Sequence, residues 1–169
     1  ILAPGAMAQQ EKETRKEKKE RIKKERLIKF KKAKAAMYDT AFVIPADNIS
    51  FARGPLVNVS STINYLQVIG KKAVLQIGNE FAAGSGLNNL GGFTLKGNIS
   101  NLKINEKKDR VFMSFTLTGM IGTARIAVSI NGSNLATVDV DGMYSGRAFT
   151  MRGDLITLKE ARIFEGTEF

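Results

Sequence analysis

Apolar and polar residues alternate along most of this chain with a period of two, which is typical of half-buried β-strands. In the stretch 92–109 the apolar positions keep this period as far as Ile99, but Leu102 and Ile104 then come one residue out of phase. A slip of one residue turns every following side chain to the opposite face of a strand. We therefore predict a β-bulge near Ser100–Asn101, which would restore the pattern.

Similar alternating runs follow one another, separated by turns rich in Gly, Asn and Lys. The run after the turn at 105–109 places four apolar residues on one face: Val111, Met113, Phe115 and Leu117. The remaining predicted strands are 42–44, 56–59, 63–69, 73–77, 123–130, 136–140 and 147–152. About eight or nine short strands predict a mainly β fold, a small antiparallel meander that closes into a barrel or a sandwich. A lipocalin-like barrel is one form that this closure could take.

A helical pattern precedes the strands. Residues 11–38 are rich in Lys, Glu, Arg and Ala, which are good helix formers. Apolar residues up to Ile28 are too sparse to form a stripe, so we expect the first half to be a solvated arm. Between Leu27 and Tyr38 enough apolar surface appears for the last turns to dock on the strands.

The net charge of +10 belongs mainly to this arm. Residues 11–34 contain 13 Lys and Arg against 5 Glu, whereas the rest of the chain is nearly neutral. A nearly neutral globular part argues against a nucleic-acid partner. Five basic residues of the arm are candidates for contact with an anionic surface, such as phosphate, lipid head groups or acidic glycans: Lys16, Lys19, Arg21, Lys23 and Lys24. The alternative is a charged spacer that binds nothing.

The first residues have the composition of a processing site. Ala6–Ala8 has the small-x-small form of a signal-peptidase site and stands directly before a polar stretch. We expect a signal-peptide remnant at 1–8, a basic helical arm at 9–40 and an antiparallel β domain at 41–169, in a protein that is periplasmic or secreted. An ordinary N-terminus is the alternative. No later run approaches the length of a membrane span.

The chain contains no His and no Cys, which removes the usual general base, thiol nucleophiles and most zinc ligands. We therefore expect no enzyme activity, no catalytic residue, no cofactor and no metal site. Asp139–Gly142 resembles a fragment of a calcium loop, but the residues that follow do not continue the ligand series. We interpret it as the polar face of a strand that enters a turn.

Aromatic residues at strand positions are candidates to line an apolar cavity inside a barrel. These residues are Tyr65, Phe81, Phe93, Phe112 and Phe149. The alternative is that they simply belong to the core.

The order of motifs resembles a Bacteroidota family of secreted proteins known as domain of unknown function 4251. The segments that carry the resemblance are the Lys/Glu-rich arm, Phe42–Val43, Tyr65–Gly70, Gly92–Gly97, Lys103–Lys108, Gly132–Val138 and Gly153–Leu155. The chain departs from the family at Leu75–Gly78, where members often have a Leu-Pro-Tyr-like segment, so a site built on that segment is in doubt here. The resemblance implies an exported location and this fold, and it brings no established activity.

Two functional hypotheses remain open. In the first, an exported β domain binds an apolar or amphipathic small molecule or an envelope protein through the barrel interior or the Gly-rich loop 79–92. In the second, a structural envelope protein touches anionic surfaces with its arm and has no ligand pocket. The sequence does not identify the partner. A cavity lined by inward-facing residues would favour the first hypothesis, and a filled interior would favour the second.

Overall fold

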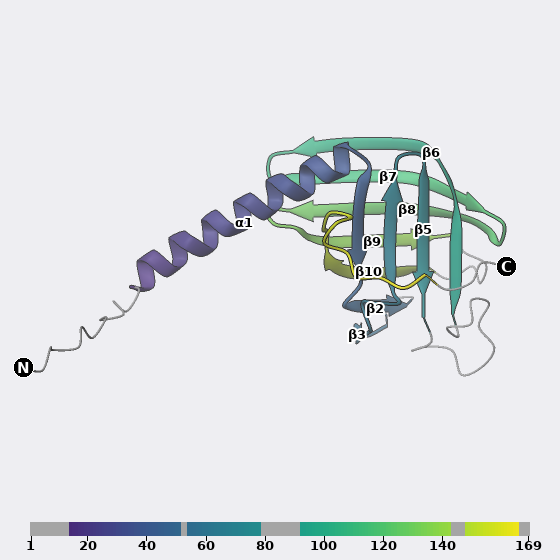
Figure 1. Ribbon diagram of the computed structural model, residues 1–169, viewed down its shortest axis with the longest axis horizontal. Coiled ribbons are helices and arrows are strands. Elements are labelled where there is room, and N and C mark those ends of the chain that lie inside the picture. Colours follow the sequence, from purple (N-terminus) through teal and green to yellow (C-terminus); the bar gives the residue numbers. More distant parts are fainter. Residues whose placement is uncertain (1–13, 52–53, 79–91, 143–147, 166–169) are drawn as a thin grey trace, which may run out of the picture.

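The computed structural model describes residues 14–51, 54–78, 92–142 and 148–165, which form one helix and a sheet of ten strands (Figure 1). The elements are α1 (Arg15–Tyr38), β1 (Ala41–Pro45), β2 (Asn48–Phe51), β3 (Val57–Asn58), β4 (Tyr65–Ile69), β5 (Lys72–Ile77), β6 (Phe93–Lys107), β7 (Arg110–Gly119), β8 (Gly122–Asn131), β9 (Leu135–Asp141) and β10 (Phe149–Asp154). The mainly β class with a preceding charged helix is therefore as the sequence predicts.

The sheet is antiparallel and strongly curled, so that a short segment of chain connects β1 at one end of the sheet with β2 near the other end. Its strand order is β1-β4-β5-β6-β7-β8-β9-β10-β2-β3, yet only Ala46 and Asp47 separate β1 from β2 in sequence. The N–H of Ala46 donates to Asn64 on the β4 side, whereas the N–H of Asp47 donates to Arg152 on β10. The chain thus turns a corner from one layer to the other. Figure 1 shows the result, with β1, β4 and β5 crossing in front of β7 to β10.

The long strand β6 forms the second corner. Its first part, Phe93–Asn98, pairs with β5, and the part from Gly97 to Lys107 pairs with β7. The register shifts between Ser100 and Lys103, where Asn101 has a positive φ of 54°. The predicted bulge is confirmed, and its bend and added twist help β6 to serve both layers.

The space between the layers is filled by apolar side chains and is covered at one side by the last turns of α1. Phe30, Ala33, Ala36 and Met37 of the helix are buried in the same core as the strands. Residues 14–29 are all exposed. The predicted docking of the last turns and the solvated first half of the helix are both confirmed.

A C-terminal strap, residues 156–165, covers the outer side of β1, β4 and β5. It begins where Ile156 forms a pair of backbone hydrogen bonds with Val43. It ends where Phe164 donates its N–H to Thr62 and accepts a hydrogen bond from the side chain of Gln76. Apolar residues of the strap pack on a small second cluster made of Val43, Tyr65 and Val74. This layer is therefore buried on both faces.

One strand was absent from the sequence prediction. Asn48–Phe51 forms β2 and pairs with β10, a partner about a hundred residues away in the chain. Its four residues do alternate between polar and apolar, but so short a run does not stand out from chance in a search for alternation. Within the described ranges, no helix combines the length and apolar character needed to cross a bilayer.

Candidate functional site: a groove on the outer sheet face

A groove of about 840 Å³ lies on the outer face of the sheet, across β7, β8, β9 and β10. It is larger than the hollows of about 470 Å³ beside α1 and about 290 Å³ beside β5. Ligand sites commonly occupy roughly 300–1,000 Å³. The groove therefore has the size of a ligand site.

Strand alternation determines which side chains line this groove. Phe115, Ile126 and Val140 are buried in the core, so the residues next to them point outward. These outward residues are Ser114 and Thr116 on β7, Arg125 and Ala127 on β8, Asp139 and Asp141 on β9, with Thr150 and Arg152 on β10. The polar side chains of the groove lie on the face that the core does not use, and the buried residues Phe115, Ile126, Val140 and Phe149 also border it.

Antiparallel pairing arranges the lining residues in rows across the strands. One row runs from strand to strand through Ser114, Ala127, Asp139, Thr150 and Ser50. A neighbouring row runs through Thr116, Arg125 and Asp141. Because the first row joins β2 to β7, only the order of strands in the sheet brings its members together.

The bulge in β6 supplies one wall of the groove. Ser100 lies opposite Thr116, and after the bulge Lys103 lies opposite Ser114. Strict alternation from Ser100 would have turned Lys103 toward the core. The extra residue instead places Asn101 and Lys103 on the groove. Bulges often redirect side chains in this way beside functional sites.

The charges in the groove are mostly unpaired. Lys103, Arg125 and Arg152 are exposed, and within the described part of the chain they form no ion pair. Asp139 accepts a hydrogen bond of 2.7 Å from the hydroxyl of Thr150, which holds its carboxylate in place. The groove thus presents free cationic donors beside an oriented acceptor.

Asp139 and Asp141 occupy the outer face of β9, and Gly142 follows them with a positive φ of 83°. This placement agrees with the interpretation of this segment as a polar strand face that enters a turn. Among the described residues, no three Asp, Glu, His or Cys side chains are grouped to hold a metal ion.

The aromatic residues predicted to line one cavity are not all brought together. Phe93 and Phe149 meet edge to face, with 6.2 Å between their ring centroids, as part of the core. Tyr65 is buried in the separate cluster beneath the strap, and Phe112 is 44% exposed on the outer face. Phe81 lies outside the described residues. The four aromatic residues that the structure describes therefore do not share one lining, although Phe149 borders the outer groove.

Each misplacement has a physical cause. Val111 and Met113 both point inward, so the period of two turns Phe112 outward. Leu66 and Val68 of β4 point into the main core, so Tyr65 points to the outer side, where the strap buries it. Among the described residues the buried hydroxyl of Tyr65 has no hydrogen-bond partner, and its pKa is raised, first by burial and then by the negative charge of Glu165.

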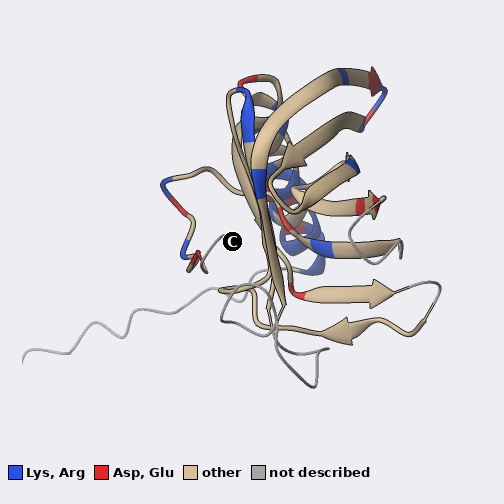
Figure 2. Cartoon of the chain, turned by 90° about the vertical axis from the view of Figure 1, so that its right-hand side faces the viewer, with Lys and Arg blue, Asp and Glu red and all other residues tan. Residues whose placement is uncertain are grey.

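The arm carries all five of the basic residues proposed for anion contact. Lys16, Lys19, Arg21, Lys23 and Lys24 are exposed on α1, and in Figure 2 the blue of Lys and Arg is concentrated on this helix. The helix begins with a capping box in which Thr14 and Glu17 exchange hydrogen bonds, which lowers the pKa of Glu17. The arm is therefore a helix with a defined start, polar on all sides over its first turns.

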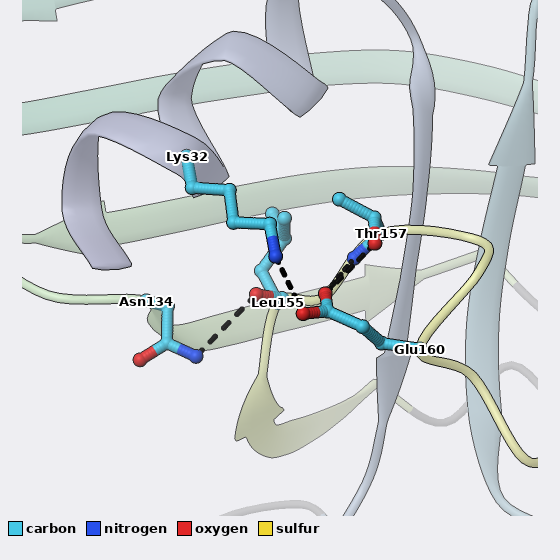
Figure 3. Close-up of polar contacts among 5 residues, drawn as sticks. All are labelled: Lys32, Asn134, Leu155, Thr157 and Glu160. Atoms are coloured by element: carbon cyan, nitrogen blue, oxygen red, sulfur yellow. Dashed lines mark hydrogen bonds and ion pairs between the residues drawn. The ribbon is translucent and has the colours of Figure 1, made fainter. Parts of the chain in front are cut away.

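The smaller hollow beside α1 marks the junction of the arm with the body. Lys32 Nζ lies 2.5 Å from Glu160 Oε1 on the strap, and Glu160 also accepts hydrogen bonds from the backbone and side chain of Thr157 (Figure 3). These contacts, led by the one from Lys32, lower the pKa of Glu160 to about 2. Asn134 donates from the opposite side to the carbonyl of Leu155. The junction thus ties the helix and the strap to the turn between β8 and β9.

These features define a curled antiparallel β domain with a charged helical arm and a polar outer groove. The chain belongs to the family described as a domain of unknown function (DUF4251), which matches residues 24–155. It is similar to a solved crystal structure of a family member from Bacteroides eggerthii, with 25% sequence identity, a TM-score of 0.70, and coverage of 82% of this chain and 94% of that chain. No curated protein matches the chain at a significant level. The family resemblance predicted from the motifs is confirmed.

Proposed function

We propose that this protein is an exported, non-enzymatic β domain that binds an amphipathic ligand or a segment of a partner protein in its outer groove. The observation that carries the proposal is the character of the groove lining. Apolar Leu56 and Ala127 lie there beside Arg125 and Arg152, which form no ion pair with the residues that the structure describes. A surface with apolar and charged side chains suits a ligand that has apolar and charged groups.

The proposed place of binding differs from the place expected from the sequence. The space between the layers is occupied by large side chains that are fully buried, among them Met113, Leu117 and Met151. A ligand there would have to displace packed core atoms, which costs stability. The outer groove requires no such displacement.

The composition supports binding rather than catalysis. The sequence offers no His or Cys as a base or nucleophile. The carboxylate of Asp139 is oriented by Thr150, which suits it to accept hydrogen bonds from a ligand.

Export is supported by the small-x-small pattern of Ala6–Ala8 ahead of the polar arm. N-terminal sequencing of native protein tests this part of the proposal, with Gln9 as the expected first residue. A mature chain that retains Ile1–Ala8 would contradict it.

A groove-filling substitution tests the binding proposal. Ala127→Trp should fill the centre of the groove, whereas Thr123→Trp places the same side chain on the same face of β8 outside the lining. Each protein is purified from its native envelope, and copurifying molecules are identified by mass spectrometry. The A127W variant should lose a molecule that wild type and T123W retain. Equal recovery from all three proteins would contradict the proposal.

A second function is favoured by the exposure of the arm, in which α1 contacts an anionic surface of the envelope. Residues 15–29 carry nine Lys and Arg against three Glu, and all are exposed. A cationic segment of this kind attracts anionic surfaces over about a Debye length. Deletion of the arm, followed by a measurement of retention on heparin, tests this function.

A further inference from the structure

The groove lies on strands whose backbone hydrogen bonds are already used. β7 pairs with β6 and β8, β8 with β7 and β9, β9 with β8 and β10, and β10 with β9 and β2. A peptide that binds by adding a strand needs a free sheet edge. A ligand in this groove must therefore be recognised by side chains.

Most of the neutral polar side chains in the groove are hydroxyls. They are Ser50, Ser114, Thr116 and Thr150, joined by the amide of Asn101. Hydroxyl and amide groups both donate and accept hydrogen bonds. They match a ligand whose own groups do both, as the hydroxyls of a sugar do.

The charged side chains further restrict the class of ligand that the groove can bind. Lys103, Arg125 and Arg152 can only donate, and they are free to bind carboxylates of a ligand. Asp139 and Asp141 can only accept, so they would repel a ligand that carries anionic groups alone. The combination fits a ligand with both hydroxyl donors and carboxylates.

The two arginines also set a minimum length for the ligand. Arg125 lies opposite Asp141 and Arg152 lies opposite Thr137, on either side of β9. From strand geometry their Cα atoms are roughly 15 Å apart along a diagonal of the sheet. A ligand that engages both ends of the groove is therefore a chain of several units.

We propose that the groove binds an acidic glycan, a chain of sugar units that bear carboxylates. Arg125 and Arg152 each bind one carboxylate of this chain. This inference rests on the proposed function and names the class of its ligand. Asp139 and the Ser and Thr hydroxyls bind sugar hydroxyls between the arginines. Phe112, two residues from Ser114 on the same outer face, offers an exposed ring against which a sugar ring packs at the rim.

The test is calorimetric titration of the full chain with hexagalacturonate. R125Q and R152Q should each raise the Kd roughly tenfold or more, because each removes a charge-assisted hydrogen bond. The neutral hexasaccharide maltohexaose should bind at least tenfold more weakly to wild type. The matched controls K71Q and K159Q each remove one exposed cation outside both the groove and the arm, and should leave the Kd within about a factor of two.

Four results would overturn the inference. Equal weakening by K71Q and K159Q would show that the overall charge of the protein, and not Arg125 and Arg152, determines the affinity. Equal affinity for maltohexaose would remove the role of carboxylates. Hexaglutamate that binds as tightly, with the same dependence on Arg125 and Arg152, would identify an acidic peptide as the ligand. Absence of hexagalacturonate binding, while A127W still loses a copurifying molecule, would refute the glycan class and leave the proposed function standing.

Discussion

Lys103 on β6 lies directly opposite Ser114 on β7, and both side chains line the outer groove. Between this pair and the pair Ser100–Thr116, β6 contains one residue more than β7. The extra residue lets Lys103 face solvent while Ile104 still packs against the core. The geometry of the bulge therefore links the stability of the fold to the composition of the groove.

The left-handed backbone at Asn101 predicts a specific sensitivity to substitution. Asn101→Ile should lower the free energy of unfolding by about 1–2 kcal/mol, because a β-branched residue is strained at a φ of 54°. Asn101→Gly should be close to wild type, since glycine adopts this conformation without strain. Urea unfolding of the three proteins measures the effect. Equal stability of N101I and wild type would show that the bulge is not retained.

The docked end of α1 should matter far more than its projecting end. Met37→Ala should cost about 2–5 kcal/mol, because Met37 is 0% exposed within the core. Ile28→Ala, at a position 65% exposed on the same helix, should change the stability by no more than about 0.5 kcal/mol. Thermal and urea unfolding give both values. Similar losses in the two variants would contradict the assignment of the helix ends.

The corner between β1 and β2 leaves no room beside Gly153. A Cβ atom at this position would lie 1.8 Å from the carbonyl oxygen of Pro45. Gly153→Ala should therefore destabilise the fold by about 1–3 kcal/mol, because the backbone of the corner must move. Asp154→Ala, at the neighbouring exposed position, is the matched control and should stay within about 0.5 kcal/mol of wild type. A G153A variant as stable as this control would argue against close contact at the corner.

Acid should weaken the contact between α1 and the strap. The pKa of Glu160 is lowered from 4.5 to about 2, mainly by Lys32 and then by Thr157. A carboxyl with a lowered folded-state pKa stabilises the fold above its unfolded pKa, so this contribution is lost as the pH falls from about 4.5 to about 2.

NMR titration of the Glu160 carboxyl and melting curves between pH 6 and pH 2 test the direction of this pH dependence. Glu160→Gln should remove the corresponding part of the acid sensitivity, so its melting temperature should fall less than that of wild type in this window. Parallel curves for E160Q and wild type would show that the contact contributes nothing.

Removal of the projecting arm should weaken anion binding and leave the stability of the fold nearly unchanged. A chain that begins at Arg26 should keep its melting temperature within a few degrees, because the deleted part of α1 is exposed. Its retention on heparin should fall sharply, and the retention of the full chain should weaken with salt as the Debye length contracts from about 10 Å at 0.1 M to about 3 Å at 1 M.

A matched control keeps the length of the helix and replaces five cations with Gln: Lys16, Lys19, Arg21, Lys23 and Lys24. It should behave like the deletion on heparin. Unchanged retention of both proteins would show that the charge of the arm does not contribute to anion binding. A large drop in the melting temperature of the shortened chain would show that the arm stabilises the fold.

Local patterns in the sequence were sufficient for most strands and for the bulge. The phase slip between Ile99 and Leu102 is visible without any knowledge of partners, because alternation is a property of each strand alone. Alternation also gives the correct faces of β7 and β8. The same rule places Phe112 on the outer face, so its phase in the strand, and not its aromatic character, decides its position.

The groove could not be found in this way, because it depends on which strands become neighbours. Ser50, Ser114 and Asp139 are far apart in the chain, and the pairing of β2 with β10 brings them into one row. The covering of Tyr65 by the strap is likewise a contact between distant segments. Polar residues on an outer face carry no periodic signal that distinguishes a site from a solvated surface.

The central claim, that ligand binds outside the sheet and not between its layers, is tested most directly by NMR with labelled methionine methyl groups and backbone amides. Met113 and Met151 are buried in the core and report on the interior, while the amides of Ser114, Ala127 and Thr150 report on the groove. The protein is titrated with the molecules released from native material. We predict shifts of the groove amides with the Met113 and Met151 methyl signals unchanged. Large shifts of those methyl signals with the groove amides unchanged would contradict the account.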